Sequence, residues 1–224
     1  MKMRLSSKQS LEVKNKKKMS KSTKHTCEEI NSKENEIKRV KKSLKSGRRL
    51  KPNILIAGTP GTGKSSLCKR LKDLLPADEN VKVINLGEFA KENDFLGDWD
   101  DKYESHEIDE DKVLDELEDI IATGNIIIEH HVTDFFPERW FDAVFVLRTD
   151  STKLYDRLLE RKYNSKKLED NVQCEIFQTI LDEARDSYQP EIVHEIFSNS
   201  VEDIETNAKN IYSWINQWIK DNSH

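Results

Sequence analysis

Short apolar runs alternate along the chain with segments in which apolar residues recur every three or four positions. The runs, which predict strands, lie at 53–57, 81–84, 125–128, 143–147 and 192–197. The segments with helical periodicity lie at 64–75, 108–123, 151–162, 169–188 and 201–220. Runs this apolar are typical of strands that are buried on both faces. The pattern therefore predicts an α/β fold in three layers, with helices on both sides of a five-stranded parallel sheet.

The last helical segment has the clearest apolar face. Its stripe follows spacings of four, three, four and three and consists of Ile204, Ala208, Ile211, Ile215 and Trp218. Such a stripe indicates packing against a core. Asn199 or Ser200 can cap the start of this helix, because both side chains accept hydrogen bonds from free backbone N–H groups.

Two polar insertions interrupt the alternation, at 87–107 and 157–168. The first is rich in acidic residues around Trp99, and the second gathers basic residues around Tyr163. Each follows an element that should point towards the same end of the sheet. Nucleotide kinases use two such segments as mobile flaps over their substrates, whereas the alternative is a pair of solvated loops.

Charge divides the chain into two parts. Residues 1–50 carry 17 Lys and Arg against 5 Asp and Glu, a net charge of +12, and the other 174 residues carry a net charge of −17. Residues 1–50 have no periodic apolar face, so we expect a disordered basic tail there and a folded domain at 51–224. Basic clusters in the tail suit nuclear import or contact with RNA, and a solvated segment without a partner is the alternative.

Cysteine usage and hydropathy limit the class of protein. Cys27, Cys68 and Cys174 lie far apart without a CxxC pair, which is typical of reduced thiols in a cytosolic or nuclear protein. No apolar run approaches the roughly 18 residues of a membrane-spanning helix, and no secretory signal is recognisable. We therefore expect no association with a membrane.

A phosphate-binding motif follows the first apolar run. Residues 58–65 read Gly-Thr-Pro-Gly-Thr-Gly-Lys-Ser and fit the pattern GxxxxGK[ST] at every fixed position, between an expected strand and an expected helix. In this context backbone N–H groups surround a phosphate at the start of the helix. Lys64 can reach the terminal phosphates, and the Ser65 hydroxyl can bind Mg²⁺. The motif predicts binding of a nucleoside triphosphate, with ATP and Mg²⁺ as cofactors.

Further polar residues follow the third and fourth apolar runs. Glu129 ends the third run, where a carboxylate commonly holds Mg²⁺, although a glutamate emerging into solvent is the alternative. His131 points to the same side of an extended chain and can orient water or phosphate, or carry a proton. Arg157 and Arg161 are four residues apart and share a helix face, so they predict either a phosphate clamp or surface salt bridges.

Several segments resemble the adenylate kinase isoenzyme 6 family, beginning with the strand and phosphate loop at 53–65. The other matching segments are DFFPERWF at 134–141, VLRTD at 146–150, NVQCEIF at 171–177, EIVH at 191–194 and WINQWIK at 214–220. The resemblance covers about residues 52–221, and the basic tail lies outside it.

The resemblance implies a broad-specificity nucleoside monophosphate kinase that transfers the γ-phosphate of ATP to AMP, and also to dAMP or CMP, and that hydrolyses ATP. It implies a monophosphate-binding insertion at about 85–108, a short lid at about 158–170 and an adenine-binding loop at Ser198–Ser200. The residues implied to act in catalysis are Lys64, Glu129, His131, Arg148 and Arg161. Those implied to bind ATP are Gly61, Thr62, Gly63, Lys64, Ser65, Ser66 and Arg161, and Ser65 and Glu129 would bind Mg²⁺.

The resemblance also implies a cellular role. It places the protein in the nucleus, and also in the cytoplasm, in maturation of the small-subunit ribosomal RNA. Expected partners are a small-subunit ribosomal protein and a pre-ribosomal particle, and we expect a monomer. An ATPase-driven assembly factor with little AMP kinase turnover is the alternative, and a P-loop kinase for another small molecule, such as a sugar or shikimate, is a third.

The sequence departs from the family pattern at four positions. Glu129 and Glu88 each stand where the family has aspartate, Lys91 replaces an arginine, and Lys162 replaces the glycine of the lid motif Arg-Gly-Tyr. A lysine lacks the planar, bidentate contact that arginine makes with phosphate. Mg²⁺ geometry also constrains the longer Glu129 side chain. ATP binding tolerates these changes, whereas turnover with AMP depends on them.

Overall fold

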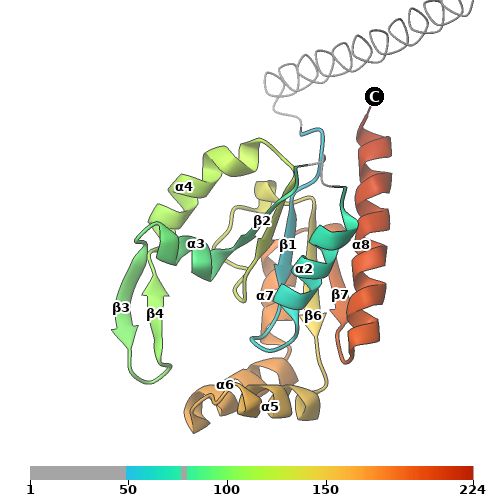
Figure 1. Cartoon of the computed structure of the whole chain (residues 1–224). Coiled ribbons are helices and arrows are strands. Elements are labelled where there is room, and N and C mark those ends of the chain that lie inside the picture. The colour runs from blue at the N-terminus through green and yellow to red at the C-terminus, as the bar shows by residue number, and fades with distance from the viewer. Residues whose placement is uncertain (1–48, 77–79, 224) are drawn as a thin grey trace, which may run out of the picture. The chain divides into compact units, whose positions relative to one another are not determined.

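The computed structural model describes residues 49–76 and 80–223. Residues from Arg49 onward form one compact unit, shown in Figure 1. The predicted basic tail lies outside the described residues up to position 48, so its disorder stays a prediction. Arg49 itself belongs to the folded unit, because its guanidinium pairs with Asp142 at 3.0 Å. The folded part thus begins two residues before the expected boundary.

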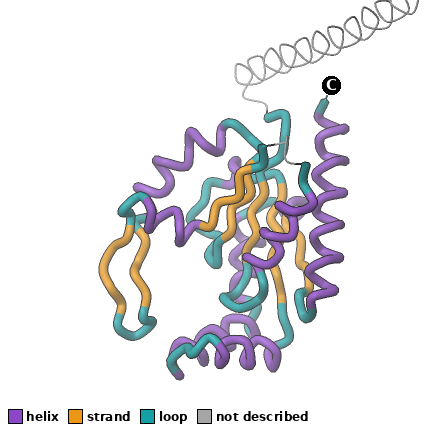
Figure 2. The backbone as a smooth tube through the Cα atoms, viewed as in Figure 1, coloured by secondary structure: helices purple, strands orange, loops and turns teal. Residues whose placement is uncertain are grey.

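A parallel five-stranded sheet forms the centre of the fold, as Figures 1 and 2 show. Its strands are β1 (Ile54–Ala57), β2 (Lys82–Asn85), β5 (Ile126–Glu129), β6 (Ala143–Arg148) and β7 (Val193–Phe197), in the order β2-β5-β1-β6-β7. All five predicted strands are confirmed. β1 pairs with β5 and β6, and its four residues are buried, which brings the carboxyl ends of the central strands to one edge.

Helices cover both faces of this sheet and confirm the three-layer α/β class. On one face α2 (Lys64–Leu74) and α8 (Val201–Asn222) pack against Ile54, Ile56 and Phe145. On the other, α4 (Glu110–Ala122) and α7 (Thr179–Ser187) pack against Leu55 and Val144. Neighbouring residues of one strand therefore serve opposite layers, as expected of a strand buried on both faces.

The C-terminal helix α8 follows the sequence prediction closely. Ala208, Ile211 and Ile215 of its stripe are buried. Ser200 caps its start by accepting a hydrogen bond from the N–H of Asp203, whose carboxylate accepts from the N–H of Ser200 in return. This reciprocal pair is a capping box, which satisfies two N–H groups that would otherwise lack partners.

The first polar insertion is more ordered than a loop. It contains the helix α3 (Leu86–Glu92) and an antiparallel hairpin made of β3 (Leu96–Asp100) and β4 (Ser105–Ile108). Asn85 caps α3 by accepting from the N–H of Glu88, and the helix buries Leu86 and Ala90. The hairpin lies apart from the central sheet and carries Trp99, which is 52% exposed.

The second insertion and the segment after it form helices. α5 (Ser151–Glu160) ends one residue before Arg161, and α6 (Ser165–Ile176) begins after a tight turn in which Lys162 has a φ of 58°. The single helix expected over 169–188 is wrong, because α6 and α7 meet at Gln178, whose φ of 59° turns the chain. The lid is therefore a turn between two helices, not a long loop.

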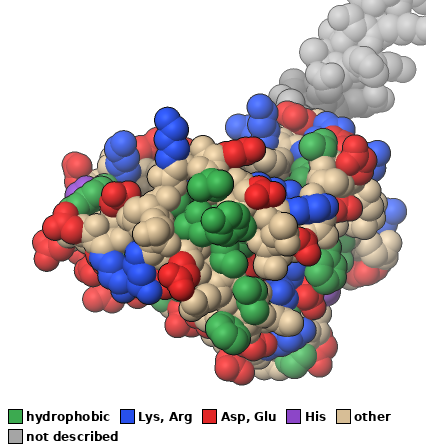
Figure 3. Space-filling view, turned by 90° about the horizontal axis from the view of Figure 1, so that it is seen from below, with side chains coloured by type: hydrophobic (Ala, Val, Ile, Leu, Met, Phe, Trp, Pro, Cys, Tyr) green, Lys and Arg blue, Asp and Glu red, His purple; other side chains and the backbone are tan. Residues whose placement is uncertain are grey.

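The outer surface of α5 and α6 mixes apolar and charged side chains. Figure 3, which views the molecule from the side where these helices lie in Figure 1, shows green side chains among red and blue ones. Leu159 and Ile176 are each 55% exposed, and Phe177, just after α6, is 71% exposed. None of these three side chains lines the cavity described next. Among the described residues, no helix is long and apolar enough to cross a membrane.

Candidate active site

The phosphate loop lies between β1 and α2, as the motif predicts. Gly58 has a φ of 138°, and a Cβ there would lie 2.6 Å from the carbonyl oxygen of Leu147. Gly63, with a φ of 102°, is the N-cap of α2 and provides no side-chain cap. The N-terminal N–H groups of this 11-residue helix thus remain available to a phosphate.

Lys64 is held inside the loop. Its ammonium donates hydrogen bonds to the carbonyl oxygens of Gly58 at 2.8 Å and Thr59 at 3.2 Å, and the residue is 8% exposed. Burial, opposed in part by the nearby carboxylate of Glu129, lowers the pKa of Lys64 to about 8. The negative charge of an entering phosphate would stabilise the buried ammonium and raise its pKa again.

Ser65 and Glu129 form an oxygen pair beside the lysine. The Ser65 hydroxyl donates to Oε1 of Glu129 at 2.5 Å, and Glu129 is 7% exposed. The register of the sheet explains the contact, because Glu129 of β5 lies opposite Ile56 of β1, just before the loop. A hydroxyl and a carboxylate that converge from two elements fit the oxygen ligands that Mg²⁺ prefers.

Two histidines follow Glu129 and differ in their surroundings. His130 is 7% exposed and packs edge-on against Phe135 and Phe136, and this burial holds its pKa well below the usual value. Both His130 and His131 line the cavity described below. Desolvation and the nearby ammonium groups of Lys64 and Lys167 lower the pKa of His131. With a pKa of about 4, its imidazole is neutral at pH 7 and is a weak base in the free protein.

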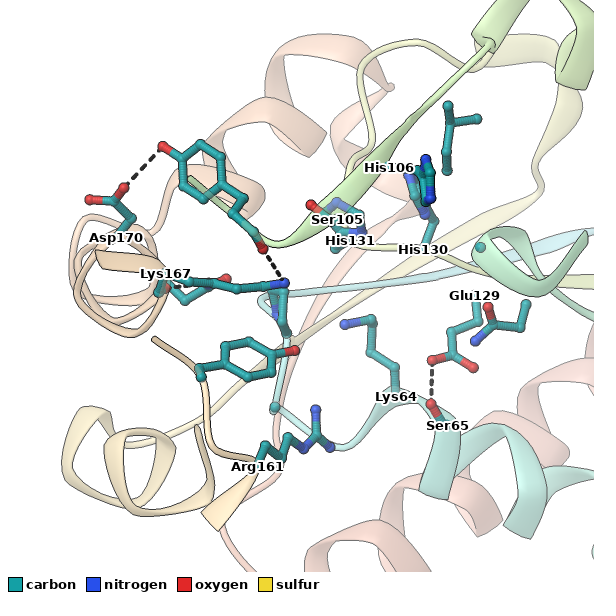
Figure 4. Close-up of a pocket in the computed structure, with 18 of the residues that line it drawn as sticks. Lys64, Ser65, Ser105, His106, Glu129, His130, His131, Arg161, Lys167 and Asp170 are labelled. Carbon is teal, nitrogen blue, oxygen red and sulfur yellow. Dashed lines mark hydrogen bonds between the residues drawn. The ribbon is translucent and has the colours of Figure 1, made fainter. Parts of the chain in front are cut away.

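These groups face a cavity of about 630 Å³, drawn in Figure 4. The phosphate loop and the end of β5 form one wall, the hairpin region a second and the lid a third. From the first insertion and the end of β2 the lining residues are Asn85, Gly87, Asp100, Tyr103, Ser105, His106, Glu107 and Ile108. From the turn between α5 and α6 and from the start of α6 they are Arg161, Tyr163, Lys167, Asp170 and Asn171. The two flaps expected from the sequence thus cover the same cavity.

The hairpin and the lid also touch each other across the mouth of this cavity. The ammonium of Lys167 donates to the carbonyl oxygen of Tyr103 at 2.7 Å, and the Tyr103 hydroxyl donates to Asp170 at 3.0 Å. Asn164 adds a hydrogen bond to the carbonyl oxygen of Lys102 at 3.2 Å. The two flaps are therefore joined by direct contacts beside the cavity.

A second cavity of about 450 Å³ adjoins the phosphate loop on the other side of Arg161. The loop after β7 lines it through Ser198 and Ser200, together with Val201 and Ile204 of α8. This is the loop that the resemblance assigns to adenine. Arg157 donates to the carbonyl oxygens of Gly61, Ser198 and Asn199 at 3.1–3.3 Å. It therefore joins α5 to both loops. Because Arg157 also lines this second cavity, its contact with a phosphate stays a prediction.

The structure brings most of the predicted site residues together. Those that line the first cavity are Gly61, Gly63, Lys64, Ser65, Ser66, Glu129, His131 and Arg161. Thr62 does not line it, because its side chain is buried and its hydroxyl donates to the carbonyl oxygen of Thr59 at 2.9 Å. Lys91 stands where the family has an arginine that would contact the acceptor phosphate. It does not line the cavity either.

Arg148 lies behind the phosphate loop, outside both cavities. It pairs with Glu175 at 2.7 Å and with Glu195 at 3.0 Å, and its side chain is 12% exposed. Glu175 is 3% exposed and also accepts from the hydroxyl of Thr59 at 2.5 Å and from the N–H of Thr149 at 2.9 Å. Arg148 can therefore support the loop through Glu175, and a direct role in catalysis stays a prediction.

Sequence reasoning overlooked several side chains at this site. Tyr103, His106 and Asp170 line the cavity, and Glu175 supports the loop, yet none belongs to a motif of known spacing. Lys167 was seen only as part of a basic cluster. The segment RKYNSKK at 161–167 places Arg161 and Lys167 on opposite sides of one turn. This spacing is the signal that could have identified Lys167 as a site residue.

Comparison with known proteins now identifies the family. The chain is 47% identical over 169 residues to an adenylate kinase isoenzyme 6 homolog from Drosophila melanogaster, covering 75% of this chain and 94% of that protein. The homolog from Dictyostelium discoideum is 46% identical over 176 residues, with 79% and 98% covered. The chain belongs to the adenylate kinase isoenzyme 6 family. A homolog from Saccharomyces cerevisiae is 44% identical over 173 residues, with 77% and 86% covered.

Two further comparisons agree with this assignment. A family model described as an AAA domain matches residues 54–178, from β1 to the end of the lid helices. A shikimate kinase from Acinetobacter baumannii, solved with shikimate, shares the fold with a TM-score of 0.51 at 16% identity, covering 74% of this chain and 93% of that one. The protein is thus a P-loop nucleotide kinase by family, and this membership implies that it binds ATP. The solved structure shows that it shares the α/β fold.

Proposed function

We propose that this protein is a nucleoside monophosphate kinase, which transfers the γ-phosphoryl group of Mg-ATP to AMP and, in the absence of an acceptor, to water. One observation carries the proposal. Lys64, the Ser65–Glu129 pair and the neutral His131 face a single cavity that the hairpin and the lid cover together. Phosphoryl transfer needs this combination of charge neutralisation, positioning and exclusion of water.

Each group has a task in such a transfer. Lys64 and the N-terminal N–H groups of α2 hold the terminal phosphates, while Ser65 and Glu129 would hold Mg²⁺, which neutralises charge on the moving phosphoryl group. Arg161 lines both cavities and can therefore contact the phosphates from the lid side at their boundary. His131 lines the same cavity and would accept the proton of the attacking oxygen once the negative charge of bound phosphates raises its pKa.

A second candidate function is an ATP-gated assembly factor with little AMP kinase turnover. The insertion at about 85–108, which lies entirely within the described residues, contributes no lysine or arginine to the cavity lining, which favours this alternative. The net charge of −17 on residues 51–224 suits a basic ribosomal protein and a pre-ribosomal particle, and the basic tail suits RNA. With this role we propose a monomer that acts in the nucleus and also in the cytoplasm.

The first experiment incubates the full chain with Mg-ATP, with and without AMP, and measures ADP and free phosphate separately. Two ADP formed for each AMP consumed, without free phosphate, would support the kinase. Release of phosphate irrespective of AMP would support the assembly factor. Lys64→Ala should abolish either activity, whereas Lys72→Ala, an exposed lysine of the same helix α2, should leave it unchanged. Wild-type activity in Lys64→Ala would refute both.

A further inference from the structure

The cavity has an unequal distribution of charge, which bears on how an acceptor is held. Within the described residues, the lysines and arginines that line it are Lys64, Arg161 and Lys167. The wall formed by residues 85–108 contributes two carboxylates, Asp100 and Glu107, and one histidine, His106, but no lysine or arginine. A dianionic phosphate would be repelled by that wall.

The proposed function assigns two of the three cations to ATP. Lys64 is hydrogen-bonded within the phosphate loop, beside the position of the terminal phosphates. Arg161 borders the second cavity as well as the first, so it lies on the ATP side. Lys167 lines the first cavity but not the second. Its ammonium lies 2.7 Å from the carbonyl oxygen of Tyr103 in the hairpin turn.

The position of Lys167 fits a phosphate that waits for transfer. Figure 4 shows its side chain extending from α6 into the cavity, which Lys64 also lines. His131 lines the same cavity as both lysines, and Figure 4 labels all three residues around it. The ammonium of Lys167 also lies over the Tyr163 ring, 4.7 Å from the centroid, and the side chain of Lys167 is half-buried. A phosphate between the two lysines would therefore lie beside the expected proton acceptor.

We propose that Lys167 binds the phosphate of the nucleoside monophosphate acceptor, a task that the wall of residues 85–108 does not perform in this chain. The inference rests on the proposed kinase function. In the free protein the ammonium of Lys167 is bound to the carbonyl oxygen of Tyr103, and the acceptor phosphate takes over as its partner. The carboxylates of Asp100 and Glu107 face the nucleoside instead, where hydroxyl and amino groups can donate hydrogen bonds to them.

The neighbouring residue provides a matched control. Lys166 carries the same charge one position earlier in α6, pairs with Asp170 at 2.7 Å, is 52% exposed and does not line the cavity. Lys166→Met and Lys167→Met therefore remove equal charge from the same helix. Tyr103→Phe serves as a second control, because it removes the hydrogen bond to Asp170 and loosens the flap contact while Lys167 stays in place.

The test measures equilibrium binding of AMP and of adenosine by calorimetry, in the presence of Mg²⁺ and a non-hydrolysable ATP analogue. Lys167→Met should weaken AMP binding at least tenfold and leave adenosine binding within twofold, because only AMP carries the phosphate. Lys167→Arg should retain most of the preference for AMP. Lys166→Met should change neither ligand by more than twofold, and Tyr103→Phe should weaken both equally.

The possible failures are distinguishable. If Lys167→Met keeps the wild-type preference for AMP over adenosine, or loses affinity for both ligands equally, Lys167 does not bind the acceptor phosphate and the kinase proposal stands unaffected. If the wild-type protein binds no nucleoside monophosphate, the kinase proposal fails and the assignment of Lys167 fails with it.

Discussion

Replacement of Glu175 should destabilise the protein strongly, although Glu175 lines neither cavity. Its carboxylate is 3% exposed and accepts from the guanidinium of Arg148 at 2.7 Å, from the N–H of Thr149 at 2.9 Å and from the hydroxyl of Thr59 at 2.5 Å. The Glu175 carboxylate of α6 thus accepts from three donors. They lie on β6, on the residue after β6 and on the phosphate loop.

The expected magnitude follows from what Glu175→Ala leaves behind. Removal of one partner of a buried ion pair lowers the free energy of unfolding by about 3–5 kcal/mol, because the other charge stays buried without its partner. Arg148 keeps a bond to Glu195, which is 31% exposed, and this places the expected loss near the lower limit, at about 3 kcal/mol. Glu175→Gln retains the shape and part of the accepting capacity, so a loss of about 2 kcal/mol is expected.

Urea unfolding followed by circular dichroism measures these changes, with the slope of each transition compared to confirm two-state behaviour. Glu195→Gln is the control, since it removes the more exposed partner of the same arginine and should cost about 1 kcal/mol or less. A loss below about 1 kcal/mol in Glu175→Ala would refute the reasoning, because it would mean that Arg148 and Thr59 find other partners at no cost.

Two further predictions concern Lys64 and Lys162. Because burial lowers the pKa of Lys64 to about 8, ATP should bind with uptake of about half a proton at pH 8, and its affinity should fall by up to tenfold per pH unit above that value. Calorimetry in buffers of different ionisation enthalpy measures the uptake, and a value of zero would contradict it. Lys162→Gly should raise the free energy of unfolding by about 1 kcal/mol, since the φ of 58° is unfavourable for lysine, whereas Lys166→Gly inside α6 should lower it by about 1 kcal/mol. Thermal unfolding distinguishes the two signs.

The linkage for Lys64 also has a consequence for stability, and its trend with pH is opposite to that of ATP affinity. Its pKa in the folded protein lies below the unfolded value of about 10.4, so between pH 8 and that value the unfolded chain holds more protons. The contribution of Lys64 to the free energy of unfolding therefore rises with pH across this window. Removal of the ammonium by Lys64→Met should abolish that rise.

Part of this protein is determined by local sequence. The phosphate loop needs glycines at fixed spacing between a buried strand and a helix, and Glu129 follows a run that is buried on both faces, so periodicity and motif suffice to place Lys64, Ser65 and Glu129 together. The start of α8 is likewise local, because Ser200 and Asp203 cap each other. Helix α3 carried a comparable signal, Asn85 three residues before Glu88, which the sequence analysis overlooked.

Other features depend on tertiary structure. The hairpin β3–β4 has no buried apolar face that a sequence pattern could reveal, and the turn at Gln178 contains no glycine or proline to mark it. Arg148 pairs with Glu175, 27 residues away, because α6 returns against the end of β6. Lys167 reaches the cavity only because the hairpin turn and α6 meet. Contacts between segments distant in sequence decide these roles, since the energy of a buried charge depends on the partners that the fold brings to it.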